Sequence, residues 1–165
     1  MIINNAIYLG TFDPITLGHV NVIKKASDIF NNVIVVVANN HTKNTIFSID
    51  ERISMIQNDI NFYKISNVKV IKSGSTVYDT LKSIDSPVTI VRGVRNNHDF
   101  ENEFRQANIN KTLYNLETVF IPATGEYQFI SSSTVKRILD LGGSIDNFVS
   151  KNTKSLLYSK LNKAN

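Results

Sequence analysis

The sequence predicts an α/β protein built on a Rossmann-like, parallel five-stranded sheet in the order 3-2-1-4-5, with helices on both faces. Two observations predict this fold. Short apolar runs of strand length alternate with longer segments of helical period, which is the pattern of a parallel sheet joined by crossover helices. Several of these runs, such as VIVVVA, are apolar at consecutive positions, which indicates strands that are covered on both faces.

The expected strands are short runs rich in β-branched residues. They are AIYLG at 6–10, VIVVVA at 33–38, VKVI at 68–71, TIVRG at 89–93 and TVFIP at 118–122. In such a sheet, ligands bind beyond the carboxyl ends of the strands, where the strand order reverses between the first and the fourth strand. We therefore expect functional residues in the segments that follow 6–10 and 89–93.

The expected helices show either an apolar face or clear end signals. After the first strand, apolar residues at 22, 23, 26, 29 and 30 share one helical face. The segment SIDE at 48–51 has the form of a capping box, so a helix is expected from there to about Tyr63. A helix is expected over about 97–114, because this segment has acidic residues at its start and basic ones near its end. Another is expected in SSSTVKRILDL, ending at Gly142-Gly143. The last is the amphipathic segment 152–161.

The composition favours one domain over residues 1–165. The chain has 18 Lys and Arg against 14 Asp and Glu, a net charge of +4, which permits an anionic partner but is a weak signal for nucleic acid. The absence of Cys excludes thiolate nucleophiles and disulfides. No apolar run approaches the length of a membrane span, so we expect a cytoplasmic protein without a membrane partner.

The segment GTFDPITLGH, residues 10–19, follows the first strand. A Gly at the strand end and Asp13-Pro14 favour a turn, and Gly18 would leave room for a ligand at a helix N-terminus, where free N–H groups favour phosphate. His19 and the hydroxyl of Thr11 could then bind phosphoryl oxygens. The alternative is that His19 only caps its helix. Neither G-x-G-x-x-G nor G-x-x-x-x-G-K-[ST] is present, so another motif would have to bind the phosphate.

Cationic residues follow the fourth strand. Arg92 and Arg95 flank Gly93, and two guanidinium groups there could clamp phosphate oxygens. The alternative is an ordinary surface pair of arginines bound to Asp99 or Glu103.

Two further segments add cationic and hydroxyl groups. Lys43, in the loop after the second strand, adds a third possible cation. FISSSTVK, residues 129–136, sets three Ser and a Thr at a helix start, where capping needs only one of them.

Three of these segments resemble a known family. GTFDPITLGH is similar to the T/H-x-G-H signature of the nucleotidylyltransferase superfamily, and RGVRNNHDFENE and EYQFISSSTVK resemble two further segments of the phosphopantetheine adenylyltransferase family. The order and spacing of the motifs agree over essentially the whole chain.

The resemblance implies adenylyl transfer from ATP to 4′-phosphopantetheine with Mg²⁺, giving dephospho-CoA and pyrophosphate without a covalent enzyme intermediate. It also implies a homohexamer that coenzyme A inhibits. Because Mg²⁺ binds phosphates and water readily, we predict no dedicated metal ligands. The catalytic residues would be His19, Thr11, Lys43 and Arg92, and the acceptor would contact Thr11, Lys43, Val77 and Arg92. The ATP site would comprise Thr11, Phe12, His19, Gly93, Val94, Arg95, Glu103, Tyr127, Gln128, Phe129, Ile130, Ser131, Ser132 and Ser133.

Four positions depart from the family pattern and none of them removes a proposed charge. They are Leu9, Leu17, Asn44 and Asn102.

Two alternatives remain open at this point. One is a related enzyme with another acceptor, such as nicotinamide mononucleotide. The other is a non-catalytic nucleotide- or RNA-binding module, although no stripe of basic and aromatic residues marks a nucleic-acid surface.

Overall fold

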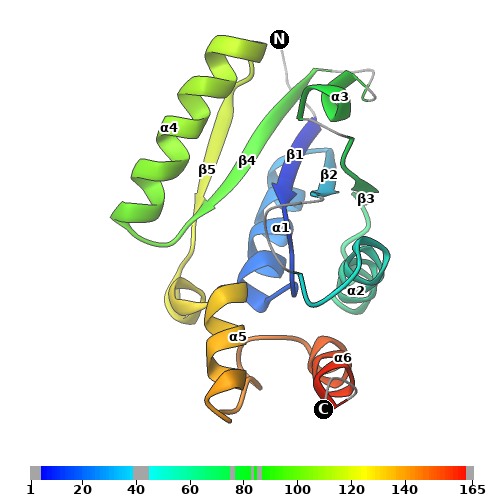
Figure 1. Ribbon diagram of the computed structural model, residues 1–165. Coiled ribbons are helices and arrows are strands. Elements are labelled where there is room, and N and C mark those ends of the chain that lie inside the picture. The colour runs from blue at the N-terminus through cyan, green and yellow to red at the C-terminus, as the bar shows by residue number, and fades with distance from the viewer. Residues whose placement is uncertain (1–4, 39–44, 75–76, 83, 85–86, 163–165) are drawn as a thin grey trace.

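A five-stranded parallel sheet organises the chain, in the order β3-β2-β1-β4-β5 (Figure 1). The computed structural model describes residues 5–38, 45–74, 77–82, 84 and 87–162. The strands are β1 (Asn5–Gly10), β2 (Asn32–Val37), β3 (Val68–Lys72), β4 (Val88–Val94) and β5 (Thr118–Pro122). The predicted fold class and strand order are confirmed, and each predicted strand lies within one or two residues of the observed one.

The helices cover both faces of the sheet, as predicted. They are α1 (Leu17–Ile29), α2 (Ile49–Phe62), α3 (Val77–Lys82), α4 (Asn97–Tyr114), the 3-10 helix η1 (Gly125–Phe129), α5 (Ser132–Asp140) and α6 (Lys151–Asn162). Helix α2 begins at the predicted capping box, with Ser48 as N-cap and Glu51 bonding back. Helix α5 ends before Gly142, which has a φ of +71°, a conformation that glycine adopts without strain.

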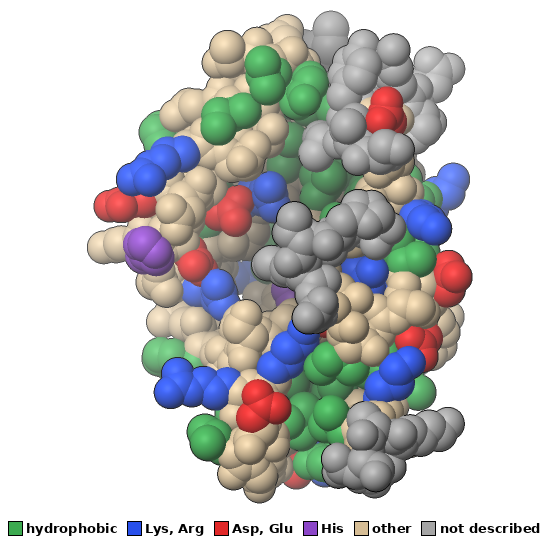
Figure 2. Space-filling model, in the orientation of Figure 1, with side chains coloured by type: hydrophobic (Ala, Val, Ile, Leu, Met, Phe, Trp, Pro, Cys, Tyr) green, Lys and Arg blue, Asp and Glu red, His purple; other side chains and the backbone are tan. Residues whose placement is uncertain are grey.

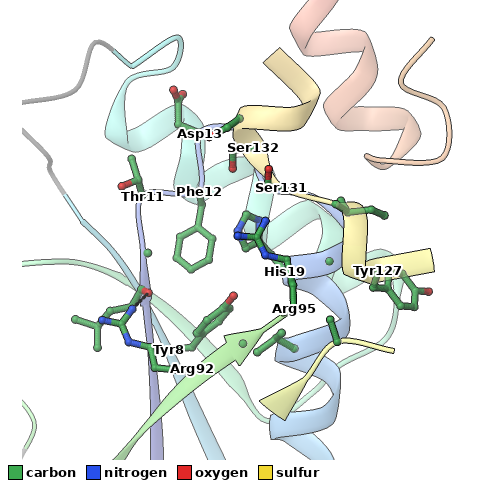
Figure 3. Close-up of a pocket in the computed structure, with 18 of the residues that line it drawn as sticks. Tyr8, Thr11, Phe12, Asp13, His19, Arg92, Arg95, Tyr127, Ser131 and Ser132 are labelled. Carbon is green, nitrogen blue, oxygen red and sulfur yellow. Dashed lines mark hydrogen bonds between the residues drawn. The ribbon is translucent and has the colours of Figure 1, made fainter. Parts of the chain in front are cut away.

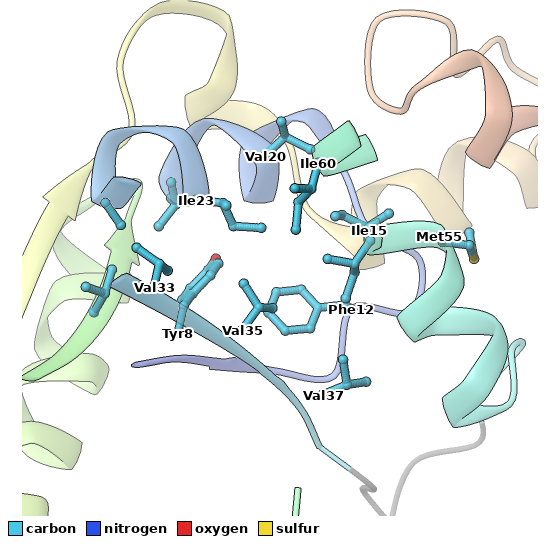
Figure 4. Packing of buried hydrophobic residues seen from close by; sticks show 14 of the residues in the cluster. Tyr8, Phe12, Ile15, Val20, Ile23, Val33, Val35, Val37, Met55 and Ile60 are labelled. Atoms are coloured by element: carbon cyan, nitrogen blue, oxygen red, sulfur yellow. The ribbon is translucent and has the colours of Figure 1, made fainter. Parts of the chain in front are cut away.

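The larger core lies on the face covered by α1 and α2. Side chains of β1, β2, β4 and β5 meet the apolar faces of these two helices there, and helices α5 and α6 extend the same cluster (Figure 4). A smaller cluster on the opposite face includes Ile7, Val36 and Val88, with Leu81 of α3 packed against it. The strands are therefore buried on both sides, which explains their apolar runs.

The register leaves a gap between β1 and β4. These strands pair from Asn5 opposite Val88 to Tyr8 opposite Val91, and no further. Beyond that point β1 continues along β2 as far as Gly10, while β4 continues along β5. The two central strands therefore separate at their carboxyl ends, which is where the order of connections reverses.

Candidate functional site

A cavity of about 480 Å³ opens where β1 and β4 separate. Its wall comes from the end of β1 and the turn after it, the start of α1, the end of β4, and the segment from η1 into α5; Figure 3 shows the main side chains and Figure 2 the hollow from outside. Most of the residues predicted for the site meet there. They are Thr11, Phe12, His19, Arg92, Gly93, Arg95, Glu103, Tyr127, Ile130, Ser131, Ser132 and Ser133.

The turn after β1 has an unusual backbone at Phe12, whose φ is +51°. A bulky residue with positive φ is strained, and such strain persists only where surrounding contacts enforce it. The ring of Phe12 is 2% exposed and meets Tyr8 and His19 edge to face, at centroid distances of 5.3 and 5.1 Å. A Cβ on Gly10 would lie 2.8 Å from that ring. Gly10 is therefore needed to seat Phe12 against the strand.

Gly18 serves helix packing. A Cβ at this position would lie 3.2 Å from the carbonyl oxygen of Ile130. Gly18 allows the chain segment before α5 to approach α1 closely, and so brings Ser131 and its neighbours to the cavity. Gly18 also lines the cavity, so the predicted approach of a ligand at this position stays a prediction.

His19 both caps its helix and lines the cavity. In the capping box of α1, the N-cap Thr16 accepts a hydrogen bond from the backbone N–H of His19, and the backbone N–H of Thr16 donates to Nδ1 of His19 at 3.1 Å. Because Nδ1 accepts this bond, the proton of the neutral imidazole is on Nε2. The two interpretations of His19 are therefore compatible: the cap orients the ring, and an N–H donor remains for a ligand.

The imidazole of His19 is neutral at physiological pH. Burial and, as a smaller effect, the positive charge of Arg95 together lower its pKa from 6.5 to about 4. His19 therefore offers a hydrogen-bond donor whose protonation does not change between pH 5 and pH 8.

Both cavity arginines are held by acidic residues. Nε of Arg92 forms an ion pair with Glu103 at 3.1 Å, and its Nη1 donates to the carbonyl of Leu9. Nε of Arg95 donates to Asp99 at 2.6 Å. The pairing that the sequence analysis treated as the alternative is present, but it lies in the cavity wall. It orients both guanidinium groups in the cavity wall, that of Arg95 beside His19 and that of Arg92 beside Tyr8.

The serines before α5 have distinct partners. Ser131 is the N-cap, and its Oγ accepts from the backbone N–H of Thr134. Ser132 donates to the carbonyl of Pro14 at 2.8 Å, which ties α5 to the turn after β1. Ser133 also lines the cavity. The first turn of α5 thus presents backbone N–H groups and hydroxyls at the cavity, an arrangement suited to an anion.

Two buried charged residues hold the turn after β1, and the sequence analysis missed both. Arg52 of α2 is 1% exposed and donates to the carbonyl oxygens of Thr11 and Ala38 at 2.7 and 2.9 Å. Asp13 is 4% exposed; it accepts from the backbone N–H groups of Ile46 and Phe47, at 2.9 and 3.0 Å.

Asp13 also pairs with Lys136 of α5. Through Asp13 and Arg52, three segments that are distant in sequence are fixed around the cavity: the turn after β1, the loop before α2, and α5.

The remaining predicted residues are not seen in this wall, three of them because they lie elsewhere and two because the structure does not describe their side chains. Val94, Gln128 and Phe129 do not line the cavity, and Phe129 is 75% exposed. Lys43 and the side chain of Val77 lie outside the described part of the chain. Conversely, the wall includes residues that the sequence analysis did not propose. They are Tyr8, Leu9, Gly10, Asp13, Val22, Thr45, Ala123 and Lys136, whereas Gly18, for which ligand space was predicted, also lines the cavity.

Comparison with known proteins identifies a family and close relatives. Residues 7–138 match a family model described as cytidylyltransferase-like. The phosphopantetheine adenylyltransferase of Dictyoglomus turgidum is 42% identical over 156 residues, 94% of this chain and 96% of that protein. The protein of the same name from Picosynechococcus sp. is 42% identical over 154 residues, 93% of this chain and 85% of that protein.

A solved structure shares the fold. It is the Plasmodium falciparum nicotinic acid mononucleotide adenylyltransferase complexed with NaAD, with a TM-score of 0.77 and 18% identity over 96% of each chain.

Replacing Arg52 by Met tests the buried network. We expect the free energy of unfolding to fall by about 2–4 kcal/mol, because the carbonyls of Thr11 and Ala38 lose their donors and Asp13 loses a nearby cation. Urea unfolding measures this change. The control is Arg105→Met on the exposed surface of α4, for which a change within about 0.5 kcal/mol is expected. Equal effects of the two substitutions would contradict the role of Arg52.

The lowered pKa of His19 predicts a pH dependence of stability. The unfolded chain binds a proton on this residue below about pH 6.5, whereas the folded protein does so only below about pH 4. The free energy of unfolding therefore has its full value above about pH 6.5. It decreases as the pH falls from 6.5 toward 4, because only the unfolded chain gains a proton on this residue in that range. Unfolding at pH 7 and pH 4.5 should show a larger loss for the wild type than for His19→Asn. An NMR titration in which the imidazole of His19 ionises near pH 6.5 would refute this.

Proposed function

Since the chain belongs to the phosphopantetheine adenylyltransferase family, a family of nucleotidyltransferases, we propose that it transfers the adenylyl group of ATP to 4′-phosphopantetheine. The observation that carries the proposal at the level of the site is the neutral His19. Its helix cap occupies Nδ1, and Nε2–H is left for a ligand in a cavity with two arginines and the start of α5. These are donors for phosphate oxygens.

The proposed reaction is a direct in-line displacement. A phosphate oxygen of 4′-phosphopantetheine attacks the α-phosphorus of ATP and forms a new P–O–P bond, and the bond from that phosphorus to the bridging oxygen breaks. The electron pair leaves with pyrophosphate, and dephospho-CoA is the other product. The attacking oxygen of a phosphate dianion carries no proton, so no general base is needed. The protein's task is then to align two polyanions and to stabilise the charge that develops.

The cavity residues have separate parts in this proposal. Nε2–H of His19 donates to an oxygen of the transferred phosphate, and Arg95 and the first turn of α5 bind the phosphates that leave. Arg92 binds the phosphate of the acceptor, together with the hydroxyl of Thr11. Lys43 and Val77 are assigned to the acceptor by the family resemblance alone, because the structure does not describe the one residue or the side chain of the other.

We propose that Mg²⁺ arrives bound to ATP, where it would neutralise phosphate charge. The carboxylates of the cavity wall are Asp13 and Glu103, and each already faces a protein cation, Lys136 and Arg92 respectively. No group of three or more His, Cys, Asp or Glu residues suited to a metal ion is found among the described residues. Phosphate oxygens and water are ligands that Mg²⁺ accepts readily, so the set of donors is compatible with this mode of binding.

Several expectations remain predictions from the family resemblance. They are the homohexamer, inhibition by coenzyme A and the cytoplasmic location. Within the described residues, no helix has both the length and the apolar character needed to cross a bilayer.

The first functional test is pyrophosphate release from Mg-ATP with different acceptors. We expect release with 4′-phosphopantetheine and none above background with nicotinamide mononucleotide. Release only with nicotinamide mononucleotide would support a nucleotidyltransferase activity but show that the proposed acceptor, 4′-phosphopantetheine, is wrong. If neither acceptor supports release, the proposed function is wrong, and RNA binding with a steep salt dependence would then favour the non-catalytic module.

A pair of substitutions at His19 separates its two roles. Asn places an acceptor near the position of Nδ1, whereas Gln places an N–H donor near that of Nε2. His19→Asn is expected to keep most of the stability and to lower kcat by about 100- to 1,000-fold, the range found when one transition-state donor is removed. His19→Gln should retain more activity but lose about 1 kcal/mol of stability with the cap. If His19→Asn is as active as the wild type, the donor role is excluded.

A further inference from the structure

The phenol oxygen of Tyr8 lies at the cavity wall and has no hydrogen-bond partner among the described residues. Tyr8 is 7% exposed and lies on β1, in the last pair that this strand forms with β4. Its ring packs edge to face against Phe12. Among the described residues, no hydrogen bond to its Oη is found, although buried Tyr hydroxyls usually have a partner. Such an oxygen in a cavity wall points to a ligand as the missing partner.

The oxygen of Tyr8 is directed into the cavity. Tyr8 lines the cavity together with His19, Arg92 and Arg95, and Figure 3 shows its hydroxyl pointing toward the space below Phe12 and His19. The rings of Tyr8 and His19 have their centroids 6.5 Å apart. Two donors so placed can bind oxygens of one phosphate group.

Gly93 keeps the approach to this hydroxyl open. A Cβ at position 93 would lie 3.8 Å from Oη of Tyr8 and 2.7 Å from Cγ2 of Val22. Any side chain on Gly93 would therefore fill the space beside the phenol and collide with α1. Gly93 is therefore required by the close packing of β4 on Val22 of α1, and it adds no side chain next to the phenol.

The charges around Tyr8 indicate what kind of ligand atom its hydroxyl can bind. The nearest charged groups are Arg92, Glu103 and Arg95, and His19 is a neutral donor on the same side of the sheet. Burial raises the pKa of Tyr8 far above its usual value, so the phenol keeps its proton and acts as a donor. An oxygen surrounded by an O–H, an N–H and guanidinium groups is best supplied by a phosphate.

We propose that Tyr8 is a further catalytic residue, whose O–H donates a hydrogen bond to a non-bridging oxygen of the phosphate that is transferred. This inference rests on the proposed adenylyl transfer. In it, Tyr8 and His19 bind the same phosphate from β1 and α1, beside the Phe12 ring that both of them contact. The contact would strengthen as negative charge moves onto the oxygens of the transition state.

Tyr8→Phe removes the hydroxyl and keeps the ring. We expect kcat for pyrophosphate release to fall by about 10- to 100-fold, the effect of losing one hydrogen bond to a charged group, and the KM for 4′-phosphopantetheine to change less than about twofold. The midpoint of thermal unfolding should not decrease. The control is Tyr158→Phe on α6, which does not line the cavity and should leave both constants unchanged. Wild-type kcat in Tyr8→Phe, or an effect confined to KM, overturns the inference.

A binding measurement separates this inference from the proposed function. Calorimetric titration with the non-reacting analogue α,β-methylene-ATP and Mg²⁺ is expected to show an affinity at least threefold weaker in Tyr8→Phe than in the wild type. If the wild type releases no pyrophosphate with 4′-phosphopantetheine, the proposed function fails, and the titration alone then decides the role of Tyr8. Equal affinities in the two proteins would rule out a contact between Tyr8 and the phosphates.

Discussion

The site depends on the hydrogen bonds that the buried guanidinium of Arg52 donates to backbone carbonyl groups. Arg52 is 1% exposed and donates to the carbonyls of Thr11, Ala38, Phe47 and Ser48. Burying this charge costs free energy that only a full set of partners offsets, so the backbone around it has little freedom. The strained φ of Phe12 is maintained by these contacts. Arg52, a residue of α2, therefore fixes the turn that places Thr11 at the cavity.

The register of the sheet and the cap of α1 act together on His19. Because β1 and β4 stop pairing at Tyr8, the chain after β1 can turn across the end of the sheet. Thr16 then caps α1 and accepts the N–H of His19 while its own N–H fixes Nδ1. A single local motif thereby sets the orientation, the tautomer and the burial of the imidazole. Its lowered pKa follows from that burial, so the same residues serve helix formation and the proposed chemistry.

The fold and most of the cavity wall were predictable because they depend on local pattern. Alternation of apolar runs located the strands, and strand order placed GTFDPITLGH beside RGVR. The network of Arg52 and Asp13 was missed because it joins residues 41 and 33 positions apart. A signal did exist: Arg52 and Asp59 occupy the same helical face as Met55, Ile56 and Ile60. A charge on an apolar face indicates a buried partner, but the sequence does not say which one.

The ion pairs in the cavity wall prepare the arginines for a ligand. Glu103 and Asp99 belong to α4, and each holds a guanidinium through Nε. The rotamers of Arg92 and Arg95 are thus restricted before a ligand arrives, which reduces the entropy lost on binding. In the described structure neither Nη group of Arg95, and only Nη1 of Arg92, has a protein acceptor. The acids therefore leave Nη groups of both arginines without a protein partner among the described residues, in a cavity wall that also contains the donors of Tyr8 and His19.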